Sequence, residues 1–443
     1  MLPDYISKAV PNPASNRAPW YVNTAPSYAG IFLWIGFYQA IAGGTVDRAS
    51  TGVAIAALAV AGVLSYALYY YVPGMLGMKT GYPLYVVGSS TFGTKGGYLM
   101  PGLLMGVLQV GWFAVGTYLA ATYILSAFGV AAKPGSLPFI LIAIVWGYTM
   151  AYVGVKGIQY VSRVSIFLNI IPFLMLLVVL YSTREGWMRH VPASPSPVLS
   201  FALLIQIVIG FFATAGAAGA DFGMSNRNAR DIRMGGLVGI ALAALFAGAL
   251  PWLSVAGARV LNPTLQATGY DAAIGSIGGV LASTMFLLFA IASIAPACIC
   301  AFVAANSFST MIPGVPRMSS TMAAVTISIV LAVTGAAANL IGFFSIVGAS
   351  FGPICGAMIA DYILSGRKWA GPREGINWAG YIAWALGFVV GILPFLPVSQ
   401  TLKEVSQPAA IYSTITGFAV YWLLAKAGME PKVVEIQRSS RAA

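Results

Sequence analysis

Charged residues are scarce in this chain. Asp, Glu, Lys and Arg make up 8% of its 443 residues, and it has one histidine, whereas 59% of its residues are hydrophobic. Because a soluble globular protein carries about 25% charged residues, this composition excludes an ordinary water-soluble fold. The mean hydropathy is +0.85, and apolar windows of about 20 residues, long enough to cross a bilayer, recur along the chain. The sequence therefore predicts an all-α integral membrane protein.

Cysteine and histidine are also too few to indicate a metal or redox site. Cys298, Cys300 and Cys355 all lie in apolar runs, and no histidine is close to them in the sequence. We interpret them as small apolar residues of the core, and we expect no metal, no cofactor and no catalytic residue. A membrane-embedded enzyme would need a nucleophile–base pair or a metal cluster at depth, and the apolar runs contain neither.

Twelve apolar segments predict twelve transmembrane helices, which we call spans 1 to 12. They cover approximately residues 27–44, 51–72, 97–127, 137–153, 161–181, 198–218, 234–256, 277–305, 319–337, 340–364, 377–397 and 408–426. The expected organisation is one transmembrane domain over residues 27–426, with a polar tail over 1–26 and a second tail over 427–443.

The net charge of +12 comes from an uneven distribution of basic residues. If the N-terminus is cytoplasmic, 17 of the 23 Lys and Arg residues fall on the cytoplasmic side of the twelve spans. The six on the outer side are Arg48, Lys133, Arg184, Arg189, Arg259 and Lys403. Because cytoplasmic loops of membrane proteins are enriched in basic residues, we expect both termini in the cytoplasm and the protein in the inner (cytoplasmic) membrane. The charge is a topology signal and does not indicate nucleic-acid binding.

Spans 1 and 6 contain clusters of glycine. The glycines are Gly36, Gly43 and Gly44 in span 1, and Gly210, Gly216 and Gly219 in span 6. Glycine weakens a helix, so such clusters indicate either unwound backbone or very close helix packing. Spans 1 and 6 hold corresponding places in two halves of five helices, which is typical of an inverted-repeat transporter with a site at mid-membrane. Unwound backbone would offer N–H and C=O groups to a polar ligand or a cation.

Polar and aromatic residues near these glycines suggest what binds there. The cores of spans 1, 3, 6 and 8 contain no ionisable side chain, which favours a neutral substrate. Span 3 reads LQVGWFAVG over residues 108–116, and its Gln109 and Trp112 lie deep in an apolar run. An aromatic ring can stack on a heterocycle while an amide bonds to its edge. Helix–helix packing is the alternative role for both residues.

Four stretches of the sequence resemble a known family. They are GTKGGYLMPGLLMGVLQVGWFAVG (93–116), GFFATAGAAGADFGMSNRNAR (210–230), FGPICGAMIADYILSGRKW (351–369) and INWAG (376–380). With them the chain resembles the nucleobase–cation symporter-1 family, which includes cytosine permeases, purine–cytosine permeases and a hydantoin transporter. The resemblance implies twelve transmembrane helices in a five-plus-five inverted repeat of the leucine-transporter type, with broken helices 1 and 6, and transport by alternating access. The repeats would cover about residues 27–181 and 198–364, with two extra helices over 377–426.

The resemblance also implies site residues. In the family a tryptophan of span 3 and an aromatic residue of span 6 hold the substrate ring, and these positions match Trp112 and Phe212. Gln109 and Thr214 match an amide and a hydroxyl of cytosine permeases, and Gln39 matches a glutamine of the hydantoin transporter. The predicted substrate-binding residues are Gln39, Gln109, Trp112, Gly210, Phe212 and Thr214.

A coupling cation is expected from the same resemblance. It implies a site made by the main-chain carbonyls of Ile35 and Tyr38 and by the positions of Ala295 and Cys298 in span 8. A hard cation prefers oxygen ligands to a thiol, and no buried carboxylate or histidine offers a simple proton relay. The sequence therefore leaves sodium coupling, proton coupling and facilitated diffusion open, with Ser293 as a further hydroxyl.

The expected function is import of a nucleobase such as cytosine or a purine, or of a related neutral heterocycle, by a secondary active transporter. The alternative is a transporter of the same fold for another heterocycle (a hydroxymethylpyrimidine, allantoin or a hydantoin) or for an amino acid. The aromatic and amide residues favour a heterocycle, although the N-terminus of a broken helix can also hold a carboxylate.

Overall fold

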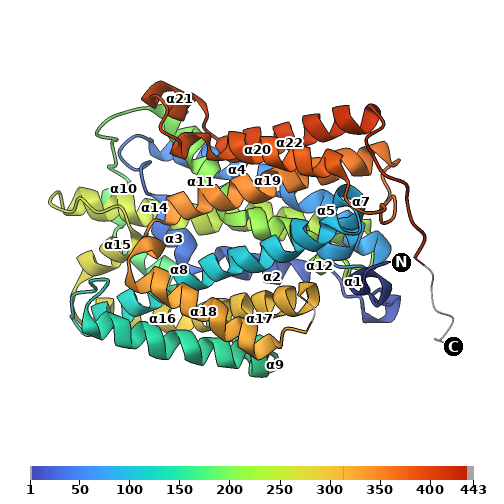
Figure 1. The fold of residues 1–443 in the computed structure, drawn as a ribbon. Helices are drawn as coiled ribbons and strands as arrows, with labels where there is room; N and C mark the ends of the chain where they lie inside the picture. Colours follow the sequence, from blue (N-terminus) through green and yellow to red (C-terminus); the bar gives the residue numbers. More distant parts are fainter. Residues whose placement is uncertain (1, 313, 437–443) are drawn as a thin grey trace.

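The computed structural model describes residues 2–312 and 314–436, with their side chains except those of residues 158–167 and 169. Within these residues every regular element is a helix (Figure 1), in agreement with the predicted all-α class. By length and composition, eight helical segments of the described chain can cross a membrane. They are Thr51–Thr80, Tyr98–Ala127, Leu137–Gly157, Pro197–Ala217, Ala229–Leu261, Gly279–Met311, Leu340–Leu364 and Trp378–Phe395.

Several of these segments contain more than one element. Span 2 comprises α4 (Thr51–Leu64), the π-helix η2 (Ser65–Tyr70) and α5 (Tyr71–Thr80), and span 3 comprises the π-helix η3 (Tyr98–Leu103) and α8 (Leu104–Ala127). Span 7 comprises α13 (Ala229–Gly236), the π-helix η4 (Leu237–Leu242) and α14 (Ala243–Leu261), and span 8 comprises α16 (Gly279–Ala292) and α17 (Ile294–Met311). Span 10 is α19 (Leu340–Leu364), and span 11 is α20 (Trp378–Ile392) with η6 (Leu393–Phe395).

The four remaining predicted spans coincide with helices outside this set of eight. Span 1 is α2 (Thr24–Phe32) with α3 (Ile35–Ile41), span 9 is α18 (Arg317–Val333), and span 12 is α22 (Ala409–Lys426). Spans 4 and 5 form one element, α9 (Leu137–Ser182), whose helical geometry is interrupted at Gly157. A helix thus accompanies each predicted span.

Short helices complete the fold. They are α1 (Asp4–Ser7), η1 (Ala14–Asn16), α6 (Leu84–Val87), α7 (Ser89–Phe92), α10 (Arg184–Trp187), α12 (Gly219–Gly223), α15 (Tyr270–Ile277), η5 (Ala336–Ala338) and α21 (Gln400–Val405).

Helices 1 and 6, which were predicted to be broken, are each divided in two. Trp34 lies between α2 and α3 in an extended conformation, with φ −90° and ψ 137°. Ala218 separates α11 (Pro197–Ala217) from α12, and its ψ of 1° departs from the helical value of about −42°. The interruption of helix 1 therefore lies just before Gly36, and that of helix 6 lies between Gly216 and Gly219.

The long helices pack in two groups. The first group consists of α2, α4, α11 and α14, and the second of α8, α9, α17 and α18. In span numbers the first group is 1, 2, 6 and 7. The second is 3, 4, 8 and 9, together with span 5, which continues span 4 in α9. Apart from span 5, each group takes the same two positions from each predicted repeat. Helices α19, α20 and α22 form a third layer along the upper edge of Figure 1, where α19 also packs on α11.

Both described ends of the chain lie at one end of this bundle, which we call the terminal face. Tyr5 and Ile6 of α1 form a buried cluster with Met311, and Ile436 packs against it. Close by, Asp361 forms a buried salt bridge of 2.8 Å with Arg373.

Candidate functional site

Trp112 of α8 is enclosed by aromatic rings from three other parts of the chain. Its ring centroid lies 5.4 Å from that of Trp34, 5.4 Å from Phe211, 4.8 Å from Phe343 and 5.3 Å from Phe344. Only 5% of Trp112 is exposed. We call these five residues the aromatic cluster. It lies where the break of helix 1, α11 and α19 meet α8.

The polar groups of the cluster are few and uncharged. Trp112 Nε1 donates a hydrogen bond of 3.2 Å to Thr214 Oγ1, which ties α8 to α11 and fixes the indole. The indole N–H of Trp34 is buried and has no hydrogen-bond partner among the residues that the structure describes. Because a buried donor without a partner is rare in folded proteins, this N–H is available to a ligand acceptor.

Gln109 lies one helical turn before Trp112. Its Nε2 contacts Met105 Sδ at 3.8 Å, and thioether sulfur is a weak acceptor. The amide lines a cavity of about 10 Å³ with Thr321 and Ser328, between α8, α17 and α18. Gln109 therefore lies on the side of α8 that meets α17 and α18, one turn from Trp112, and keeps unused hydrogen-bonding capacity.

The aromatic side chain that α11 directs toward Trp112 is Phe211, whereas Phe212, the residue predicted to hold the substrate ring, packs against α2. Phe212 is fully buried and stacks on Phe32 of α2, with centroids 5.3 Å apart and planes at 8°. Successive residues of an α-helix point about 100° apart. Phe211 therefore faces α8, and Phe212, the next residue, faces α2. Phe212 thus packs within the first group.

Gln39 does not reach the aromatic cluster, because other partners hold its amide. Its Nε2 donates to Asp271 Oδ1 at 2.6 Å, and its Oε1 accepts from Tyr123 Oη at 3.1 Å and from the N–H of Asp271 at 3.0 Å. Asp271 belongs to α15, an element that the hydropathy windows did not predict. The structure therefore joins Gln39 to the loop between spans 7 and 8.

Gly210 serves close packing of α11 on α19. A β-carbon at this position would lie 2.5 Å from the carbonyl oxygen of Phe344, so a larger residue would push the two helices apart. No break occurs at Gly210, which lies inside α11.

The four residues predicted for a cation site are not gathered in one place. Ala295 and Cys298 lie in a buried cluster with α9, where Cys298 Sγ is 4.0 Å from Met150 Sδ. Ile35 and Tyr38 belong to the main buried cluster instead. Helix α17 packs its Ala295–Cys298 face against span 4. Ser293, at the junction of α16 and α17, is buried and donates to the carbonyl of Phe289.

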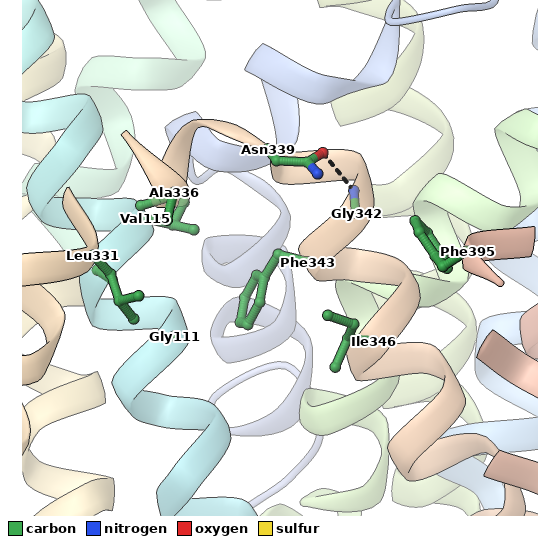
Figure 2. Close-up of a pocket in the computed structure, with 11 residues that line it drawn as sticks. Gly111, Val115, Leu331, Ala336, Asn339, Gly342, Phe343, Ile346 and Phe395 are labelled. Atoms are coloured by element: carbon green, nitrogen blue, oxygen red, sulfur yellow. Dashed lines mark hydrogen bonds between the residues drawn. The ribbon is translucent and has the colours of Figure 1, made fainter. Parts of the chain in front are cut away.

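A cavity of about 240 Å³ opens next to the aromatic cluster. Figure 2 shows its walls, with Gly111 and Val115 on α8 and Gly342, Phe343 and Ile346 on α19. Asn339 is the polar side chain of the lining, and its Oδ1 caps the start of α19 by accepting from the N–H of Gly342. The ring of Phe343 borders this cavity and also contacts Trp112, so it separates the two.

Four members of the cluster were missed by the sequence analysis: Trp34, Phe211, Phe343 and Phe344. A local signal existed for three of them, because the tetrapeptide IGFF occurs twice, at residues 209–212 and 341–344. Each copy places an aromatic ring beside Trp112. Gly210 of the first copy lies against α19, and Gly342 of the second lies against the side chain of Asn339. Trp34 lies in the break of helix 1.

Comparison with known proteins yields one matching family model, described as permease for cytosine/purines, uracil, thiamine and allantoin, over residues 10–419. The cytosine permease of Escherichia coli (strain K12) is 27% identical over 362 residues, which cover 77% of this chain and 79% of the permease.

Solved structures share the fold. Mhp1, a nucleobase–cation-symport-1 family transporter in a closed conformation with bromovinylhydantoin bound, aligns with a TM-score of 0.71 at 18% identity, covering 94% of this chain and 95% of its own. The inward-facing conformation of Mhp1 aligns with a TM-score of 0.70 at 17% identity, covering 97% of both chains. A sodium-coupled sialic acid symporter aligns with a TM-score of 0.58 at 13% identity, covering 98% of this chain and 93% of its own.

Proposed function

The chain belongs to the family of permeases for cytosine and purines, uracil, thiamine and allantoin, and from this membership we propose that it imports a nucleobase or a closely related neutral heterocycle by cation-coupled symport. It is a multi-pass membrane transporter and not an enzyme. The observation that carries the proposed substrate class is the aromatic cluster: an indole held by Thr214 and surrounded by the rings of four uncharged residues.

The cluster suits a planar, uncharged ring. A heterocycle stacked on the Trp112 indole would gain dispersion and quadrupole contacts. The free N–H of Trp34 would donate to a ring carbonyl or ring nitrogen, and the amide of Gln109 would bond to another edge. Because aromatic side chains now fill the space around Trp112, a ligand must displace one of them. Phe343 is the candidate, since the cavity behind it can receive its ring.

We also propose that both termini are cytoplasmic and that the protein lies in the inner (cytoplasmic) membrane. The support is the excess of basic residues in the loops that lie on the same side of the membrane as the N-terminus. The described N- and C-terminal segments meet at the terminal face, as an even number of spans requires.

Uptake of a radiolabelled nucleobase into proteoliposomes tests the proposal. We expect unlabelled nucleobases and related heterocycles to compete for uptake, and amino acids not to compete. Competition by amino acids alone would favour the alternative of an amino-acid transporter. Chromatography of the recovered label should return the unchanged compound.

Gln109→Leu tests whether the amide sets selectivity. A ligand that leaves a buried amide unpaired is disfavoured by about 1–3 kcal/mol, so the substitution should weaken the best substrate and reduce discrimination among heterocycles. Inhibition constants for a panel of heterocycles, measured for both proteins, give the ranking. An unchanged ranking would show that Gln109 only packs helices.

Replacement of external sodium by choline tests the coupling ion. Ala295 and Cys298 face span 4, so the carbonyls of Ile35 and Tyr38 alone would leave sodium with few oxygen ligands. We expect initial uptake to fall by less than about tenfold, which corresponds to about 1.4 kcal/mol of coupling. A steep, saturable sodium requirement would mean that span 8 supplies ligands that we have not identified.

A further inference from the structure

We propose that residues 5–18 form a strap that connects the two helix groups at the terminal face. The contacts of the strap with one of the two groups must break before the transporter opens at this face. The inference rests on the proposed alternating-access function, because the strap restrains the two groups only if they move relative to each other during transport. It is carried by contacts that one short segment makes with both groups.

The first anchor attaches the strap to the second group. Tyr5 Oη donates a hydrogen bond of 2.7 Å to the carbonyl of Thr94, just before η3 begins span 3. The Tyr5 ring packs edge-on against Tyr98 of η3, with centroids 6.1 Å apart. Ile6 is fully buried and lies in one cluster with Met311, the last residue of α17. Spans 3 and 8 therefore both contact α1.

The second anchor attaches the strap to the first group. The N–H of Asn12 donates to the carbonyl of Gly81 at 2.9 Å, directly after α5, and its Nδ2 donates to the carbonyl of Met224 at 3.0 Å, directly after α12. Arg17 Nη1 donates to the carbonyl of Met78 in α5 at 2.8 Å. These bonds satisfy carbonyls at helix C-termini, which lack partners within their own helices.

The chain between the anchors is short. From Ile6 to Asn12 there are six residue steps, and a fully extended chain covers at most about 3.6 Å per step, or about 22 Å. The strap therefore sets an upper limit to the separation of the two groups at this face while both anchors hold. A tail that merely covered one helix end would contact one group only.

Figure 1 shows α1 at the end of the bundle where N is marked. Both anchors consist largely of neutral hydrogen bonds and buried apolar side chains. Each is weak enough to release, because a neutral hydrogen bond contributes about 0.5–1.5 kcal/mol net. Opening at the terminal face, the cytoplasmic side in the proposed orientation, would thus require loss of one anchor.

The test measures the separation of the groups without any substrate. Spin labels are placed on cysteines introduced at Thr310 of α17 and Arg230 of α13, both exposed residues on opposite groups, after Cys298, Cys300 and Cys355 are replaced by alanine. Double electron–electron resonance then gives the label distances for Tyr5→Ala, Asn12→Ala and the double variant. Tyr5→Phe, which removes only the hydroxyl, serves if Tyr5→Ala does not fold.

We expect each single variant to raise the ratio of long to short distances about fivefold, as expected for one lost hydrogen bond, and the double variant to raise it no further. Lys8→Ala is the matched control, because Lys8 bonds only to Asp4 and both side chains are exposed; its distances should equal those of the parent. Unchanged distances in the single variants would overturn the strap. So would a ratio in the double variant that multiplies the two single effects, or a change of the distances in the control. If the distances shift as expected but no heterocycle is transported, the strap stands and the proposed function fails.

Discussion

Trp112→Ala should abolish high-affinity uptake while the protein still inserts into the membrane at normal levels. Base–aromatic stacking contributes about 1–3 kcal/mol per ring in other proteins, so loss of the indole should weaken binding by about 5- to 150-fold. The substitution also removes the ring that four other aromatic residues contact. Concentration dependence of initial uptake, normalised to protein in the membrane, measures the effect.

Two controls separate stacking from general damage. Trp112→Phe keeps an aromatic face and should retain much of the affinity, although it loses the bond to Thr214. Trp378→Ala removes an exposed tryptophan at the start of α20 and should leave uptake unchanged. Normal transport by Trp112→Ala would mean that the substrate binds elsewhere.

Asp361→Ala should cause the largest loss of stability. Asp361 Oδ1 lies 2.8 Å from Arg373 Nη1, and each of these side chains is 5% exposed. The other carboxylate oxygen accepts from the hydroxyls of Ser90 and Thr91, so the pair joins the end of α19 to α7. Removal of one partner of a buried ion pair costs up to about 3–5 kcal/mol. Without Asp361, the buried Arg373 guanidinium would keep the carboxylate of Glu430, 2.9 Å from Nη2, but would lose its more deeply buried partner.

The measurement is the thermal midpoint of the purified protein in detergent, followed by size-exclusion chromatography. We expect a clear fall in the midpoint for Asp361→Ala and partial recovery when Arg373→Met is added, because the second change removes a buried charge that has lost one of its two carboxylate partners. Asp4→Ala breaks the exposed pair with Lys8 and should change the midpoint little. Equal midpoints for Asp361→Ala and Asp4→Ala would contradict the structural role of the buried pair.

The helices were predictable because the membrane leaves few alternatives. Backbone polar groups within a bilayer must bond to one another, so an apolar window of sufficient length becomes a helix. That rule predicted α19 at its observed limits, Leu340–Leu364. It gave no sign of α15, whose eight residues include Asp271 and lie outside the apolar windows.

The sequence predicted which helices form the site, but it did not predict which side chains face the site, because these depend on the rotation of each helix about its axis. The glycines and the amide around Trp112 identified span 3, but the choice between Phe211 and Phe212 depends on how α11 is turned, which neighbouring helices decide. The partner of Gln39 is 232 residues away in the chain, so no local pattern indicated it. The repeated IGFF was readable in the sequence and would have pointed to Phe343.

The most direct test of the account is a structure of the protein with a brominated nucleobase bound, in which anomalous scattering locates the bromine. The account predicts that the heterocycle lies in van der Waals contact with the Trp112 ring, within reach of the Trp34 N–H, and that Phe343 has moved toward the cavity of Figure 2. A bromine in that cavity with the aromatic cluster unchanged, or at any site remote from Trp112, would contradict it.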